Sequence, residues 1–212
     1  TGDTGSSVNK AVLSLNNPLA DVFYGIDNTF LSRGLKEGIF VAYQSPALVN
    51  VDDTFKLDPN HFVTPIDYGD VCLNFDNAYF EENNLSVPKT LSELTLPVYK
   101  SLLVVENPAI SSPGLSFLFA TIGAFGEEES FNYWQDLIEN DVLIVNDWET
   151  AYYQEFSMWG GSRPIVVSYS SSPLFEYLYS EEEIEIPPTS VLTLSESCFR
   201  QIEFAGILKG TK

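Results

Sequence analysis

The sequence is short of positive charge, histidine and cysteine, and the first two shortages exclude whole classes of function. Ten Lys and Arg residues stand against 30 Asp and Glu residues, which gives a formal net charge of −20. A surface of this sign repels the phosphates of nucleic acids and of anionic membranes, so neither is expected as a partner. The one histidine, His61, leaves little for a histidine-based metal site, and the sequence predicts neither a metal nor a cofactor.

Long apolar runs are also missing. No stretch of roughly 18 apolar residues could span a membrane, and no signal peptide is visible. The chain opens on Thr1 instead of Met, which is typical of a processed or partial chain. Hydrophobic residues make up 44% of the 212 residues and charged residues 19%, a balance typical of a globular protein.

The two cysteines, Cys72 and Cys198, both lie in apolar, strand-like segments. Two positions in a sequence do not fix a pairing, so a disulfide stays open at this point. The apolar surroundings favour two buried free thiols, which is the state that we expect.

Strand-like and helical segments alternate along the chain, which indicates an α/β fold. Helices are expected over residues 6–16, 29–36, 115–122, 147–156 and 173–179. Strands or extended segments are expected over residues 20–24, 71–75, 102–105, 142–145, 165–169, 191–194 and 198–208. A further helix starts at Gly126, and its apolar side is expected to include Phe131, Trp134, Leu137 and Ile138.

Two strand-to-helix turns are built alike. Each follows an apolar strand with serines and then a proline, at Ser111–Pro113 and at Ser170–Pro173. Proline suits the first turn of a helix, and serine is a frequent N-cap. The free N–H groups of such helices face the carboxyl ends of strands, where α/β proteins bind ligands. The turns therefore predict a shared binding cleft, with Trp148 at its mouth, one residue after the expected N-cap Asp147.

Five short motifs stand out in order along the chain. They are Ala20-Asp-Val-Phe-Tyr-Gly-Ile-Asp-Asn, Pro65-Ile-Asp-Tyr-Gly, Asn107-Pro-Ala-Ile-Ser-Ser-Pro-Gly-Leu, Trp148-Glu-Thr-Ala-Tyr and Ser168-Tyr-Ser-Ser-Ser-Pro. Their order and approximate spacing resemble those of the thiamine-binding proteins of bacterial ABC transporters, within the periplasmic solute-binding superfamily.

The resemblance implies a periplasmic-binding-protein fold of type 2, with two α/β lobes and a ligand cleft between them. Residues 1–97 with 194–212 are expected to form one lobe, which is incomplete, and residues 98–193 the other. Compared with the family, the chain is expected to lack segments at both ends.

The resemblance also implies a function. It indicates an exported, periplasmic or cell-surface binding component and not an enzyme. Such a monomer would capture thiamine or a thiamine phosphate and deliver it to the membrane permease of an ABC transporter.

Carried over by position, the resemblance implies nine ligand contacts. They are Thr4, Gly5, Ser111, Ser112, Trp148, Tyr169, Ser170, Ser171 and Ser172. The aromatic groups would stack on the ligand's rings, and the hydroxyls and amides would hold its polar atoms. Phe175 stands where the family has an aromatic hydroxyl, which removes one polar contact.

Other functions stay open. The same fold could bind a polyamine or another cationic organic molecule, or less readily ferric iron through Tyr152 and Tyr153. An enzyme would need His61 beside Ser111 or Ser171, and the sequence contains neither a nucleophile elbow nor a phosphate-binding loop.

Overall fold

The computed structural model describes residues 2–181 and 183–211, and these group into two compact units. One unit comprises residues up to 68 together with those from 201, and the other comprises residues 69–200. Residues 69–97, which the sequence assigned to the first lobe, thus belong to the second compact unit. The lobe boundaries themselves stay a prediction.

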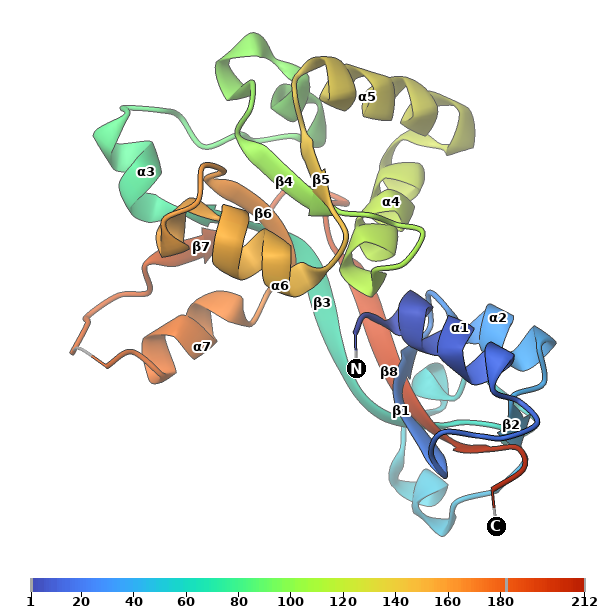
Figure 1. Ribbon diagram of the computed structural model, residues 1–212. Helices are drawn as coiled ribbons and strands as arrows, with labels where there is room; N and C mark the ends of the chain where they lie inside the picture. Colours follow the sequence, from blue (N-terminus) through green and yellow to red (C-terminus); the bar gives the residue numbers. More distant parts are fainter. Residues whose placement is uncertain (1, 182, 212) are drawn as a thin grey trace. The chain divides into compact units, whose positions relative to one another are not determined.

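The first unit is built around the antiparallel pair β1 (Val22–Asp27) and β8 (Phe199–Leu208). The two-residue strand β2 (Phe40–Val41) joins the end of β8. Helices α1 (Thr4–Leu13) and α2 (Leu31–Lys36) accompany β1, which confirms the expected order of helix, strand and helix (Figure 1). Between β2 and β3 the chain forms only short 3₁₀ turns at Pro46–Asn50 and Asp53–Phe55.

The second unit contains a mixed sheet in which β6 (Ile165–Tyr169) lies between two neighbours. It pairs antiparallel with β3 (Thr64–Asp76) and parallel with β4 (Leu103–Glu106). Strand β5 (Leu143–Val145) extends the sheet parallel to β4, and β7 (Thr189–Val191) pairs with the other edge of β3. Parallel strands of this kind are covered on both faces, which the unbroken apolar runs of β4 and β6 predict.

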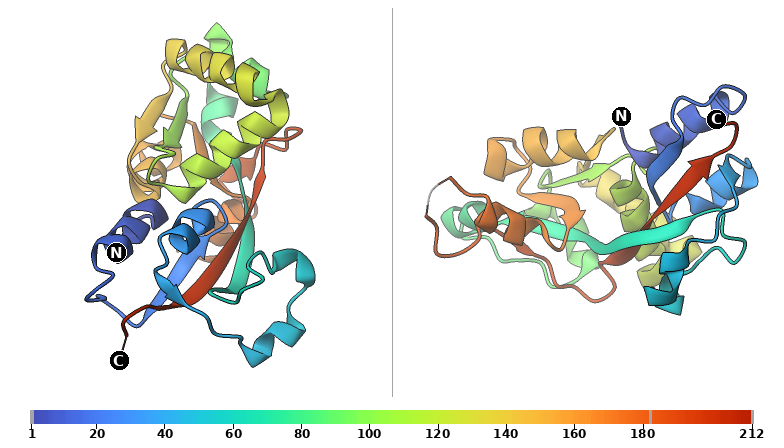
Figure 2. Two further views of the ribbon diagram at one scale, coloured as in Figure 1. Left: turned by 90° about the vertical axis from the view of Figure 1, so that its right-hand side faces the viewer. Right: turned by 90° about the horizontal axis from the view of Figure 1, so that it is seen from below.

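Alternation along β4 and β6 divides the core of this unit between the two faces of the sheet. Leu103, Val105 and Val167 point to one face, where α4 (Ser112–Phe125) and α5 (Glu127–Glu139) pack. Val104 and Val166 point to the other, under the helical segment that begins with α6 (Trp148–Thr150). Helices α4 and α5 pack on each other, and the left view of Figure 2 shows them side by side. Helix α3 (Asn77–Glu82), capped by Asp76, and α7 (Ser172–Leu178) complete the unit with 3₁₀ turns at Leu91–Thr95 and Pro97–Tyr99.

The apolar side expected for α5 is only partly right. Leu137 is buried and Trp134 packs on the core, but Phe131 and Ile138 are 70% and 60% exposed. The buried face instead includes Tyr133, whose hydroxyl donates to the carbonyl of Leu91 at 3.0 Å. The tyrosine hydroxyl finds an acceptor in the core, so the ring can be buried.

The free thiols expected at Cys72 and Cys198 are wrong. The two residues form a disulfide with a Cα–Cα distance of 4.4 Å, across 126 residues of sequence. Near the bridge, the guanidinium of Arg200 forms an ion pair with the carboxylate of Asp70. Strand β3 is therefore tied twice to the segment 198–200, where β8 begins, by contacts that local sequence context does not reveal.

Candidate ligand-binding site

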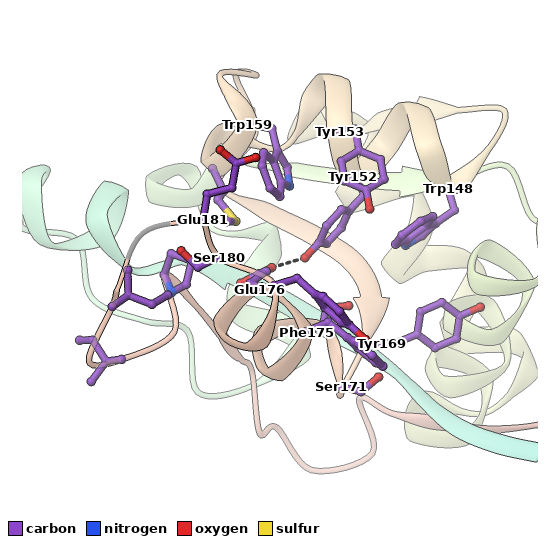
Figure 3. Close-up of a pocket in the computed structure, with 16 residues that line it drawn as sticks. Trp148, Tyr152, Tyr153, Trp159, Tyr169, Ser171, Phe175, Glu176, Ser180 and Glu181 are labelled. Carbon is purple, nitrogen blue, oxygen red and sulfur yellow. Dashed lines mark hydrogen bonds between the residues drawn. The ribbon is translucent and has the colours of Figure 1, made fainter.

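A cavity of about 1030 Å³ opens within the unit formed by residues 69–200 (Figure 3). Its walls come from the helical segment 148–159, from the end of β6, and from α7 with the chain that follows it. Aromatic side chains dominate the lining, namely Trp148, Tyr152, Tyr153, Trp159, Tyr169, Phe175 and Tyr179. Pockets lined by aromatic residues and a few placed polar groups are typical of small-molecule sites.

The first wall is positioned by the start of α6. Asp147 is its N-cap, as predicted, and accepts hydrogen bonds from the N–H of Thr150 at 2.8 Å and from its hydroxyl at 3.0 Å. Beyond Thr150 the helix widens into a π-turn over Ala151–Glu155, in which the N–H of Phe156 donates to the carbonyl of Ala151. Turns of this kind are frequent at functional sites because they change which side chains share a face.

Trp148 is the centre of the aromatic cluster on this wall. Its indole stacks on the ring of Tyr152, with centroids 4.9 Å apart and planes 18° apart. The rings of Tyr153 and Tyr169 meet it edge-on, at 5.5 Å and 6.3 Å. Trp148 thus packs on its own helical segment and still lines the cavity.

The opposite wall is α7, which carries Phe175 and Glu176, together with Tyr179 directly after it. Phe175 and Tyr179 lie one turn apart and stack at 5.9 Å with planes 7° apart. Both rings are more than half exposed, at 54% and 77%. In Figure 3 the rings of the first wall and the side chains of α7 lie on opposite sides of the same space.

A hydrogen-bond network joins the two walls. The indole N–H of Trp148 donates to the hydroxyl of Ser168 at 3.0 Å, and that hydroxyl lies 2.9 Å from the hydroxyl of Ser172. On the other side, the hydroxyl of Tyr152 donates to one oxygen of Glu176, and the hydroxyl of Thr189 donates to the other. Burial, followed by the hydrogen bond to Glu176 and its charge, raises the pKa of Tyr152. Tyr152 is therefore a neutral donor at physiological pH.

The charge of the cavity is negative. Glu176 and Glu181 are the charged side chains among the described residues that line it, and none of those residues is Lys, Arg or His. Aromatic faces also attract cations, because the ring quadrupole is negative above the plane. The cavity is therefore suited to a cationic or neutral ring system.

The structure brings together four of the nine predicted contact residues. Trp148, Tyr169, Ser171 and Ser172 line the cavity. Ser170 lies between them in sequence but is not part of the lining, and its N–H donates to the carbonyl of Asp70 at 2.8 Å.

The other predicted contacts are not among the residues that line this cavity. Ser111 and Ser112 are buried at the start of α4. Thr4 and Gly5 belong to the first turn of α1 in the other unit, where the Thr4 hydroxyl donates to the carbonyl of Gly25 at 3.3 Å. A ligand role for these four residues stays a prediction.

The two serine–proline turns do start helices, but the expected side-chain capping by serine is wrong. Ser111 and Ser171 precede α4 and α7, and neither side chain makes a capping hydrogen bond. A serine N-cap bonds to the N–H of the second or third helical residue. Here Pro113 and Pro173 are the second helical residues and have no N–H. In addition, Ser171 has a helical backbone, with φ −85° and ψ −13°, instead of the extended one of an N-cap.

Several lining residues were not predicted as contacts, above all Glu176, Trp159, Tyr179 and Glu181. The four-residue spacing of Trp148 and Tyr152, and of Phe175 and Tyr179, was a usable signal, since such residues share one helix face. For Glu176 the sequence offered no such signal, because its hydrogen-bond partners Tyr152 and Thr189 lie on other elements.

The fold and the cavity fit a solute-binding protein. The sequence model described as bacterial extracellular solute-binding protein matches residues 17–177, and the chain belongs to this family. The expectations of a protein that acts outside the cytoplasm and of a binding protein, not an enzyme, are confirmed by this membership. The disulfide agrees with it, because disulfides persist in oxidising compartments. Among the described residues, no helix has the length and apolar character needed to cross a membrane.

Among curated proteins, the chain is similar to thiamine-binding periplasmic proteins. It is 27% identical to that of Escherichia coli K12 over 211 residues, which cover 99% of this chain and 60% of the relative. It is also 27% identical to that of Haemophilus influenzae over 179 residues, which cover 84% of this chain and 51% of the relative. The chain thus spans between half and two thirds of the length of these relatives.

Solved structures confirm the predicted periplasmic-binding-protein fold class. A periplasmic thiamin binding protein matches 100% of this chain and 62% of its own, with a TM-score of 0.81 and 24% identity. The periplasmic binding protein AfuA from Actinobacillus pleuropneumoniae, bound to fructose-6-phosphate, matches 100% and 65%, with a TM-score of 0.84 and 20% identity. At these identities the likeness concerns the fold alone.

Proposed function

We propose that this chain is the extracytoplasmic solute-binding component of an ABC transporter, and that it captures thiamine or a thiamine phosphate for delivery to a membrane permease. The observation that carries the proposal is the aromatic, negatively charged cavity around Trp148. The names of its curated relatives support the choice of ligand. Action as a monomer belongs to the same proposal.

Thiamine suits this cavity chemically. It consists of an aminopyrimidine ring and a positively charged thiazolium ring, and both are flat. Trp148 and Tyr153, half-buried and exposed respectively, offer faces for ring stacking and for a cation–π contact. The exposed hydroxyl of Ser171 offers a polar contact nearby. A ligand role for the remaining predicted contacts, Thr4, Gly5, Ser111, Ser112 and Ser170, belongs to the same proposal.

Another cationic organic ligand, such as a polyamine, is favoured by one specific observation. The described lining residues provide carboxylates and aromatic faces without a basic group. A ferric site is disfavoured, because the Tyr152 hydroxyl is engaged with Glu176 and its pKa is raised. An iron-bound tyrosinate would have to lose that proton.

The proposal is tested by titrating the intact chain with thiamine, thiamine monophosphate and spermidine, using tryptophan fluorescence and calorimetry. We expect thiamine or its phosphate to bind and to quench tryptophan emission. Trp148→Ala removes the ring surface and should weaken binding about 10- to 100-fold, which corresponds to roughly 1.4–2.8 kcal/mol.

The matched control is Phe131→Ala, which removes a ring that is 70% exposed and does not line the cavity. It should leave binding unchanged. Trp148→Phe, which keeps an aromatic face, should retain part of the affinity. An intact chain that binds neither thiamine nor its phosphate refutes the proposal, and a chain that binds only spermidine favours the second candidate.

A further inference from the structure

Among the described residues that line the cavity, Glu176 is the carboxylate whose side-chain hydrogen bonds fix its place in the wall. It lies on α7, is half-buried, and contributes to the lining. Each of its oxygens accepts one hydrogen bond, from Tyr152 on one side and from Thr189 on the other. Thr189 is only 1% exposed, so the second donor comes from inside the protein.

These two hydrogen bonds orient the carboxylate but do not use all of its acceptor positions. An ionised carboxylate offers about four acceptor positions, and the two donors occupy two of them. Both donors are neutral hydroxyls, so they stabilise the negative charge but do not cancel it. The side chain is therefore held in place and can still accept a donor or a positive charge from a ligand.

Hydrogen bonds and ring contacts also fix the position of Glu176 relative to the aromatic wall. Tyr152 joins Glu176 to the ring of Trp148, since the two aromatic rings lie 4.9 Å apart. Ser172 hydrogen-bonds the Tyr152 hydroxyl, and its own hydroxyl lies 2.9 Å from that of Ser168, which accepts from Trp148. The carboxylate and the aromatic face thus have fixed positions relative to each other (Figure 3).

We propose that Glu176 is the specificity-determining residue of this cavity, and that it selects flat ligands with a positive charge over neutral ligands of the same shape. The aromatic walls contact flat rings whether they are charged or neutral, and Glu176 favours the ring that carries a positive charge. This inference rests on the proposed function and deepens it, because it names the chemical class that the site accepts. Ser168 and Ser172 then act by positioning, as their hydroxyls are used within the protein.

The test compares thiamine with its neutral thiophene isostere, which has the same shape but no charge on the ring. The wild-type chain should bind thiamine at least about tenfold more tightly, as expected for one charge-assisted contact. In Glu176→Gln, which keeps the size and an acceptor oxygen, the preference should fall to about twofold or less. Glu185→Gln is the matched control, because Glu185 is exposed and does not line the cavity. It should keep most of the preference.

Each outcome decides between the two proposals. Absence of binding of both compounds to the wild-type chain refutes the proposed function. Binding of both with equal affinity leaves that function in place and overturns the role of Glu176, as does a preference that survives in Glu176→Gln.

A salt titration of the wild-type chain covers the case in which Glu176→Gln does not fold. Ions screen the carboxylate but leave ring stacking intact, so the preference for thiamine should shrink in molar salt. A preference that does not change with salt overturns the proposal without any variant.

Discussion

At Gly114 helix α4 passes very close to the backbone of strand β4. It follows Pro113 in the first turn of α4, and a Cβ at this position would lie 2.2 Å from the carbonyl oxygen of Glu106 at the end of β4. Ordinary contacts of a Cβ atom begin at 3.4 Å. Gly114→Ala therefore requires α4 to move away from β4 by about 1 Å, which disturbs a close-packed core.

The cost can be worked from these distances. Overpacking of this kind typically costs about 1–3 kcal/mol, and the upper part of that range applies because the obstacle is backbone and cannot rotate away. The better helix propensity of alanine offsets part of this cost, by up to about 1 kcal/mol. We expect a net loss of about 2 kcal/mol in the free energy of unfolding, or roughly 4–8 °C in Tm for a chain of this size.

Gly123→Ala, in the same helix, is the matched control. A Cβ at Gly123 would meet nothing within 4 Å, so alanine there should raise stability by up to about 1 kcal/mol. Urea unfolding followed by far-ultraviolet circular dichroism measures both changes. Equal effects of the two substitutions, or a gain in stability from Gly114→Ala, would refute the close approach of α4 to β4.

Two further predictions concern the disulfide and the half-buried acid Glu203. Reduction of Cys72–Cys198 opens a covalent loop with a sequence separation of 126, so dithiothreitol should lower the unfolding free energy by about 5 kcal/mol. It should leave the double variant Cys72→Ala, Cys198→Ala unaffected. An unchanged Tm of the reduced wild-type chain contradicts this prediction. Burial, then the charges of Asp67 and Asp27, raise the pKa of Glu203. The folded state therefore holds the proton more tightly, and the ionised group lowers stability above its folded pKa. Glu203→Gln should raise Tm at about pH 8, with a gain that fades as the pH falls to about 4; a gain that is constant across this range argues against the pKa shift.

Much of the α/β framework follows from the sequence alone. The apolar runs at 102–105 and 165–169 are strands because β-branched residues fit a sheet covered on both faces. Proline in the first turn indicated both serine–proline helices; α7 starts within one residue of the prediction, and α4 starts at Ser112, three residues before it. Asp147 was recognisable as a cap because its interaction with Thr150 spans only three residues. Periodicity and capping are local properties, so they can be read from neighbouring residues.

Only the tertiary structure decided which side chains meet. The disulfide depends on β3 and β8 coming together across 126 residues, and no local pattern reports such a distance. The cavity required the π-turn after α6 and the placing of α7 against it, which brought Glu176 to Tyr152 and Thr189. The sequence determined that a serine–proline turn precedes α7, and the packing decided that Trp148 and the carboxylate of Glu176, more than serine hydroxyls, shape the site. Contacts between distant segments depend on the whole packed core, and for this reason they were beyond local inference.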